Sequence, residues 1–132
     1  MINIADCGKK GRGVLAGKKF KRGEIIEQAP VIVIPGSELY SIKSTVLNDY
    51  YFIWAKDENN LKTGAIALGC GSLYNHSYKP NATFNKKHKD LIIEFKALSD
   101  IEEGEEITIN YNGDPEDDAP LYFEVVGDSP VL

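Results

Sequence analysis

The sequence predicts a mainly β domain of the α+β class, because short apolar runs recur between turn signals and only one segment repeats at helical spacing. Residues 31–34 form a continuous β-branched run between Pro30 and Pro35, which is typical of a buried strand. Residues 107–111 alternate apolar and polar side chains, which is typical of a half-buried strand. With 132 residues, the chain has room for one domain.

The other elements follow along the chain in the same short style. Apolar segments are expected at residues 14–16, 24–27, 66–68, 82–84 and 91–95, with turns at residues 21–23, around Gly104 and at a charged hairpin tip, residues 86–90. Residues 41–55 are the predicted helix, because Leu47, Tyr50, Tyr51 and Trp54 recur at three- and four-residue spacing. Ser44 is its expected cap.

Composition excludes several classes of function. The formal charge of −5 argues against a protein that binds nucleic acid by neutralising phosphates. Two histidines and two widely separated cysteines argue against a zinc site of the usual ligand spacing. The chain contains neither an apolar run of about 20 residues nor the apolar core of a secretion signal. We therefore expect a soluble intracellular protein, in the cytoplasm or the nucleus, without a bound metal.

Three short motifs carry the chemical signal. They are Gly11-Arg12-Gly13, the loop Tyr74-Asn75-His76-Ser77-Tyr78-Lys79-Pro80-Asn81, and Glu106-Ile107-Thr108-Ile109-Asn110-Tyr111. Each alone has a simpler explanation: the first as a turn, His76 as a structural hydrogen-bonding residue, and Tyr111 as a core side chain. Pro80 restricts its own φ and the backbone conformation of the residue before it, so the end of this loop is expected to be rigid.

Taken together and in this order, the motifs resemble the signature of the SET-domain protein-lysine methyltransferases. The compact single-domain type, as in a small viral SET methyltransferase, is the most similar, and the resemblance spans about residues 11 to 114. It implies a SET-domain β-clip core of short strands, in which the C-terminal strand passes beneath an earlier loop as a pseudoknot. The SET domain would cover residues 1–113, and residues 114–132 would be a short acidic and aromatic tail closing the cofactor site.

The resemblance also implies S-adenosyl-L-methionine as cofactor. Glycine suits a close approach of the backbone to a ligand because it has no Cβ. An asparagine amide offers an uncharged donor and acceptor, and a loop backbone offers paired groups to an adenine edge. The residues expected to bind the cofactor are Gly11, Arg12, Gly13, Asn75, His76, Tyr111, Tyr122 and Phe123, with Asn75 at the amino-acid end, the His76 backbone at the adenine, and Tyr122 or Phe123 closing over it.

Tyr111 is the expected catalytic residue, since the family places a tyrosine hydroxyl at the end of a narrow lysine channel. Tyr50 and Ile109 are the expected channel residues, although Tyr50 is equally compatible with packing on a helix face. The family often has Phe or Tyr where Ile109 stands, so the number of methyl groups transferred stays open. Two further departures are Tyr78, where Cys is frequent, and Asn112, where Gly commonly follows the tyrosine.

The resulting functional hypothesis is a protein-lysine N-methyltransferase acting on a basic protein, histone or histone-like. An acidic run after Gly113 is either an attraction for such a substrate or an ordinary solvated loop. The alternative of a different class is a non-catalytic SET-fold module that binds a partner protein. The cysteine-rich, zinc-binding segment that closes the site in other family members does not follow Tyr111 in this sequence. A second subunit could close the cofactor pocket instead, so a homodimer is also expected.

Overall fold

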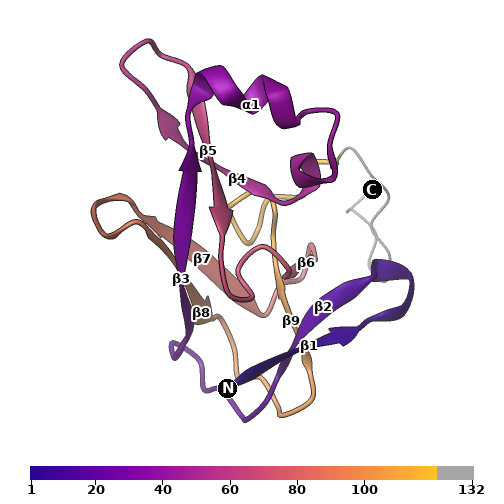
Figure 1. Ribbon diagram of the computed structural model, residues 1–132. Helices are drawn as coiled ribbons and strands as arrows, with labels where there is room; N and C mark the ends of the chain where they lie inside the picture. Colours follow the sequence, from indigo (N-terminus) through magenta and orange to yellow (C-terminus); the bar gives the residue numbers. More distant parts are fainter. Residues whose placement is uncertain (122–132) are drawn as a thin grey trace.

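The computed structural model describes residues 1–121, which form two β-sheets and one short α-helix (Figure 1). The strands are β1 (Ile2–Asp6), β2 (Arg12–Ala16), β3 (Ile25–Ile34), β4 (Tyr51–Lys56), β5 (Lys62–Ala67), β6 (Asn75–His76), β7 (Ala82–Lys87), β8 (Ile92–Ala97) and β9 (Glu106–Ile109). The helical segments are α1 (Gly36–Ile42) and the 3₁₀ turns η1 (Gly8–Lys10), η2 (Val46–Asp49) and η3 (His88–Asp90). The mainly β, α+β class is confirmed. No helix in this part of the chain is long and apolar enough to cross a membrane.

Strand β9 lies inside the four-stranded sheet, although it is the last strand along the described chain. The strand order is β1-β2-β9-β6, with β9 antiparallel to β2 and parallel to β6. The Asn81 side chain adds to this pairing: its amide donates to the Glu106 carbonyl, and its oxygen accepts the Thr108 N–H, both at 2.9 Å. Segments from the beginning and the middle of the chain therefore enclose the C-terminal strand, as the expected pseudoknot requires.

The five-stranded sheet has the order β4-β5-β3-β8-β7, with β3 at its centre. The first part of β3 pairs with β8 and the last part with β5, and the change falls between Pro30 and Val31. A proline fits there because its missing N–H is tolerated where ladder pairing changes. The segments expected separately at residues 24–27 and 31–34 therefore belong to one strand that runs through Pro30. Residues 31–34 are also not a fully buried run, since Ile32 is 56% exposed while Val31 and Val33 pack against the core.

The two terminal strands of this sheet approach each other. The rings of Phe52 on β4 and Phe84 on β7 meet edge to face with centroids 5.1 Å apart. Beside them, His88 Nε2 donates to the Trp54 carbonyl at 2.8 Å. The sheet is therefore curled around a core whose largest fully buried side chains are Tyr74, Phe20, Phe95, Ile93, Ile101, Ile107, Ile109 and Val14.

The helix predicted for residues 41–55 is wrong. Helix α1 ends at Ile42, η2 follows, and residues 51–56 are strand β4, with Tyr51 opposite Ile66 and Phe52 opposite Ala65. Aromatic and β-branched side chains favour a strand wherever a partner strand is present, and pairing with β5 overrides the helical spacing. Ser44 caps no helix; instead the neighbouring Thr45 hydroxyl donates to the Ile42 carbonyl at 2.7 Å.

The hairpin predicted around residues 86–90 is confirmed, with a shorter tip. Strand β7 continues through Lys86 and Lys87, so only η3 and Leu91 make the turn. Leu91 adopts a left-handed conformation with φ of 53°. Lys86 therefore lies within a strand, and its side chain leaves from one face of the sheet.

Glu94 is expected to make the stability of the fold depend on pH. This buried carboxylate accepts a hydrogen bond from Gln28 at 2.9 Å and pairs with Lys87 at 3.1 Å. The Gln28 hydrogen bond first, and then Lys87, hold the pKa of Glu94 below its ordinary value. A lowered folded-state pKa contributes stability that is present above the unfolded pKa of about 4.3 and is lost as the pH falls through the folded pKa.

The stability advantage of the wild type over Glu94→Gln should therefore shrink as the pH falls below the unfolded pKa of about 4.3 and towards the lower folded-state pKa. Urea unfolding at a series of pH values measures it. The exposed Glu103→Gln serves as the control and should show no such trend. An advantage independent of pH would contradict this account of Glu94.

Candidate active site

Tyr111 is held at two points by the segment that contains the Asn-His motif. Its backbone N–H donates to His76 Nδ1 at 2.9 Å, and its hydroxyl donates to the Tyr74 carbonyl at 2.5 Å. The residue follows β9, whose parallel pairing with β6 brings the two motifs together. Tyr111 is 39% exposed, so its ring is anchored while one side stays open. The pseudoknot that the resemblance implies thus brings the Asn75-His76 motif beside Tyr111.

Tyr74 is itself fixed by a network that reaches back to β3. Its hydroxyl donates to Glu27 Oε1 at 2.8 Å, while Glu27 Oε2 accepts the Cys70 N–H at 2.9 Å. Its ring stacks on Phe95 with centroids 4.3 Å apart. Burial, together with the Glu27 carboxylate, raises the pKa of Tyr74 far above its ordinary value. Tyr74 is therefore a neutral donor, and the carbonyl that receives the Tyr111 hydroxyl belongs to a residue clamped in the core.

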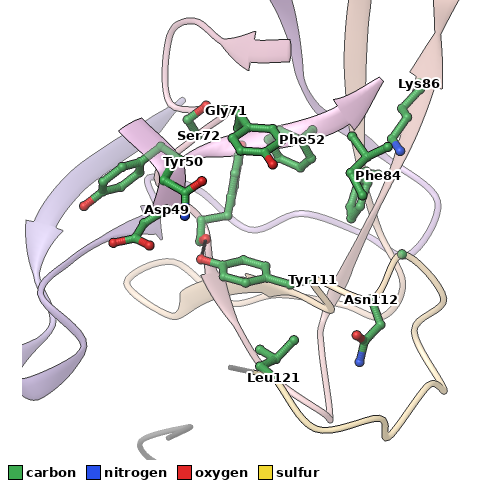
Figure 2. Close-up of a pocket in the computed structure, with 15 residues that line it drawn as sticks. Asp49, Tyr50, Phe52, Gly71, Ser72, Phe84, Lys86, Tyr111, Asn112 and Leu121 are labelled. Atoms are coloured by element: carbon green, nitrogen blue, oxygen red, sulfur yellow. Dashed lines mark hydrogen bonds between the residues drawn. The ribbon is translucent and has the colours of Figure 1, made fainter. Parts of the chain in front are cut away.

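A pocket of about 340 Å³ opens next to the Tyr111 hydroxyl (Figure 2). Six of its fifteen lining residues are aromatic, and its walls come from η2, β4, the segment before β6, β7 and the segment after β9. The lining residues are Asn48, Asp49, Tyr50, Tyr51, Phe52, Ile53, Gly71, Ser72, Tyr74, Phe84, Lys86, Tyr111, Asn112, Gly113 and Leu121. Tyr50, between η2 and β4, lines this pocket, although no helix carries it, and its part in a substrate channel stays a prediction.

The Gly11-Arg12-Gly13 motif contacts the side chain of Asn75, which lies on β6. The Asn75 amide donates to the Arg12 carbonyl at 3.2 Å and to Glu106 Oε2 at 2.7 Å. A Cβ on Gly13 would lie 2.6 Å from the Asn75 amide nitrogen and 2.5 Å from Glu106 Oε2. Only glycine fits at position 13 without displacing these groups. The fold thus gathers Gly13, Asn75 and Glu106 into one polar cluster, which Lys10 joins through a 3.1 Å ion pair with Glu106.

Sequence reasoning missed three residues of this site. Glu106 was part of the third motif but was assigned no role, although an acidic residue opening an apolar strand is a usable signal. Tyr74 directly precedes Asn75-His76, and its position was the only sign of its part in holding Tyr111. Glu27 lies 47 residues from Tyr74, and nothing in the linear sequence pairs them.

Other predicted site residues fall elsewhere. Ile109 is completely buried in the core and does not line the pocket, which corrects its placement on the channel wall. Tyr122 and Phe123 lie outside the described residues. The part of the tail before them returns to the site: the Ala119 carbonyl accepts the Tyr78 hydroxyl at 3.0 Å, and Leu121 lines the pocket. Within residues 1–121, no group of His, Cys, Asp and Glu side chains could hold a metal ion.

The Asn75-His76 strand holds Tyr111 beside a pocket with aromatic walls, and comparison with known proteins identifies the protein family that has this arrangement. The SET domain family matches residues 11–112, so the chain belongs to the SET-domain family of protein-lysine methyltransferases. A Schizosaccharomyces pombe histone-lysine N-methyltransferase, H3 lysine-37 specific, is 34% identical over 111 residues, covering 83% of this chain and 72% of that protein.

Solved structures share the fold. A candidate histone methyltransferase of Plasmodium falciparum matches with a TM-score of 0.64 and 32% identity, over 84% of this chain and 96% of that one. The SET-domain histone lysine methyltransferase of Neurospora matches with a TM-score of 0.65 and 20% identity, over 83% of this chain and 51% of that one. The second similarity bears on the fold alone.

Proposed function

We propose that this protein transfers a methyl group from S-adenosyl-L-methionine to a lysine side chain of a basic protein, histone or histone-like. The observation that carries the proposal is the Tyr111 hydroxyl, fixed on the Tyr74 carbonyl beside an aromatic pocket. A pure scaffold would not need Asn75, His76 and Tyr111 together. The non-catalytic binding module is therefore the weaker alternative.

The cluster around Gly13 fits the proposed cofactor. Gly13 leaves room for the Asn75 amide and the Glu106 carboxylate beside its backbone, and these two groups together suit a ligand that carries both an ammonium and a carboxylate. We assign the backbone of His76, on the last strand of the four-stranded sheet, to the adenine ring of the cofactor, as the family resemblance implies. When bound, S-adenosyl-L-methionine would supply an electrophilic methyl group on a sulfonium.

The chain's own task is to present a neutral lysine amine in line with that methyl group. A free lysine has a pKa of about 10.4 and is an ammonium at neutral pH. The aromatic walls formed by Phe52, Phe84 and Tyr50 disfavour the charged form by removing water. We assign the oxygen of the Tyr111 hydroxyl, whose hydrogen is donated to the Tyr74 carbonyl, the role of accepting an N–H of the amine and orienting it. Holding two reactants in the correct orientation supplies a large part of the decrease in activation free energy of a bimolecular reaction.

The substrate class rests on charge and on relatives. The chain carries a net charge of −5, which favours encounter with basic segments. The Schizosaccharomyces pombe relative is described as specific for a histone H3 lysine. We extend to this chain only the class, a lysine in a basic protein, and include non-histone proteins such as ribosomal or DNA-compacting ones.

Closure of the cofactor site is part of the same proposal. Leu121 and Ala119 bring the beginning of the tail to the pocket and to Tyr78, which supports a tail of residues 114–132 that folds over the cofactor. Tyr122 and Phe123 would provide the covering side chains. A homodimer is the other means of closure; sedimentation that shows only monomer at working concentrations would remove it.

The test is transfer of isotope-labelled methyl groups to purified histones and to a basic whole-cell extract, with mass spectrometry of the labelled residues. Label on lysine supports the proposal, and the labelled band identifies the substrate protein. Calorimetry with S-adenosyl-L-methionine runs in parallel. Absence of cofactor binding would contradict the methyltransferase proposal and favour the binding module.

A further inference from the structure

The pocket beside Tyr111 carries a lysine that the proposed chemistry does not use. Lys86 lies on β7, two residues after Phe84, and both side chains face the pocket because successive side chains of a strand alternate between faces. Figure 2 shows Lys86 beside Phe84 on one side of the pocket and Asp49 on the other, with Tyr111 between them. The pocket therefore carries both an acidic and a basic side chain, whereas a site for a uniformly basic substrate segment would be expected to carry acidic side chains alone.

Lys86 differs from its neighbour in its partners. Lys87 is paired with the buried Glu94 at 3.1 Å. Over residues 1–121, the ion pairs are made by Lys10, Lys18, Lys19 and Lys87, and no carboxylate approaches the Lys86 ammonium within 4 Å. Partial burial against the pocket wall lowers the pKa of Lys86. A cation that has lost hydration without gaining a carboxylate is best stabilised by an anion that arrives with a ligand.

We propose that Lys86 forms a subsite for an acidic side chain of the substrate, located in sequence close to the target lysine. The inference rests on the proposed function and narrows it: the preferred lysine lies in a basic protein but has an Asp or Glu neighbour on one flank. The charge of Lys86 fits a carboxylate and disfavours a basic residue at that flank, so the same side chain selects for one sequence and against another.

The experiment measures kcat/KM for peptides built around a lysine that the wild-type protein methylates. Each position up to about four residues on either side is changed in turn to Asp, Asn or Lys, a span that an extended chain of about 3.3 Å per residue carries across the pocket. We expect Asp to exceed Lys by roughly three- to tenfold at one position on one flank, typical of a partly desolvated charge pair. In Lys86→Glu this preference should invert, and in Lys86→Met it should vanish.

Lys89→Glu is the matched control. Lys89 lies on the exposed η3 turn of the same hairpin and does not line the pocket, yet its substitution changes the net charge equally. It should leave the preference unchanged. An unaltered preference in both Lys86 variants, or an equal change in Lys89→Glu, would overturn the subsite. If no substrate is methylated at all, the proposed function fails first; if peptides are methylated without dependence on flanking charge, only the subsite fails.

Discussion

Tyr111→Phe is expected to lower kcat/KM for methyl transfer by roughly 10²-fold or more, a loss typical of removing one positioned polar group from an active site. The hydroxyl is the atom that the Tyr74 carbonyl holds at 2.5 Å, and its oxygen is the acceptor that we assign to the lysine amine. The phenyl ring would keep its place, because the backbone N–H of residue 111 still reaches His76. The loss should therefore fall on kcat rather than on folding.

Three measurements separate this outcome from general damage. Calorimetric affinity for S-adenosyl-L-methionine should change little, and the urea midpoint should stay close to that of the wild type. Tyr40→Phe removes a hydroxyl from a side chain that is 82% exposed on α1, and it should leave activity unaltered. Retention of more than about a third of wild-type kcat in Tyr111→Phe would remove Tyr111 from the catalytic role, since one positioned group is typically worth far more.

Phe95→Ala is expected to cost about 3–5 kcal/mol of unfolding free energy, the usual range for a fully buried aromatic side chain. Phe95 is completely buried on β8, stacks on Tyr74, and contacts the rings of Phe52 and Phe84. Its removal opens a cavity beneath the residue whose carbonyl holds Tyr111. Methylation should therefore decline more steeply than the folded fraction.

Urea unfolding measures the stability change, and activity per folded molecule measures the effect on the site. Phe95→Leu retains most of the volume and serves as the milder variant if Phe95→Ala does not fold. Tyr40→Ala, also an aromatic truncation but at an exposed position, should change stability by less than about 0.5 kcal/mol. A cost for Phe95→Ala below about 1 kcal/mol would mean that the core does not depend on this ring.

The sequence predicted the motif residues well because their order along the chain is itself diagnostic. Asn75, His76 and Tyr111 are brought together by pairing of β6 with β9, and Gly13 meets Asn75 through β2. The helix prediction for residues 41–55 was wrong because it relied on local residue spacing alone. The strand β5, whose pairing with β4 determines the conformation of residues 51–56, lies further along the chain.

The supporting contacts could not be predicted, since they join residues with no local relation. Glu27 and Tyr74 come together only when β3 and the loop before β6 pack. Ile109 illustrates the same limit. The family resemblance assigned it to the channel wall, whereas its side chain is completely buried in the core.

The insertion of β9 between β2 and β6 affects how the protein is made. Residues 1–105 are synthesised before this strand, so β2 and β6 cannot pair with β9 until the later part of the chain is made. Contacts between segments so distant in sequence form late and slowly. Tyr111 follows β9 directly, so a nascent chain acquires its active-site hydroxyl only in the step that closes the fold, and partly synthesised chains should be inactive toward every substrate.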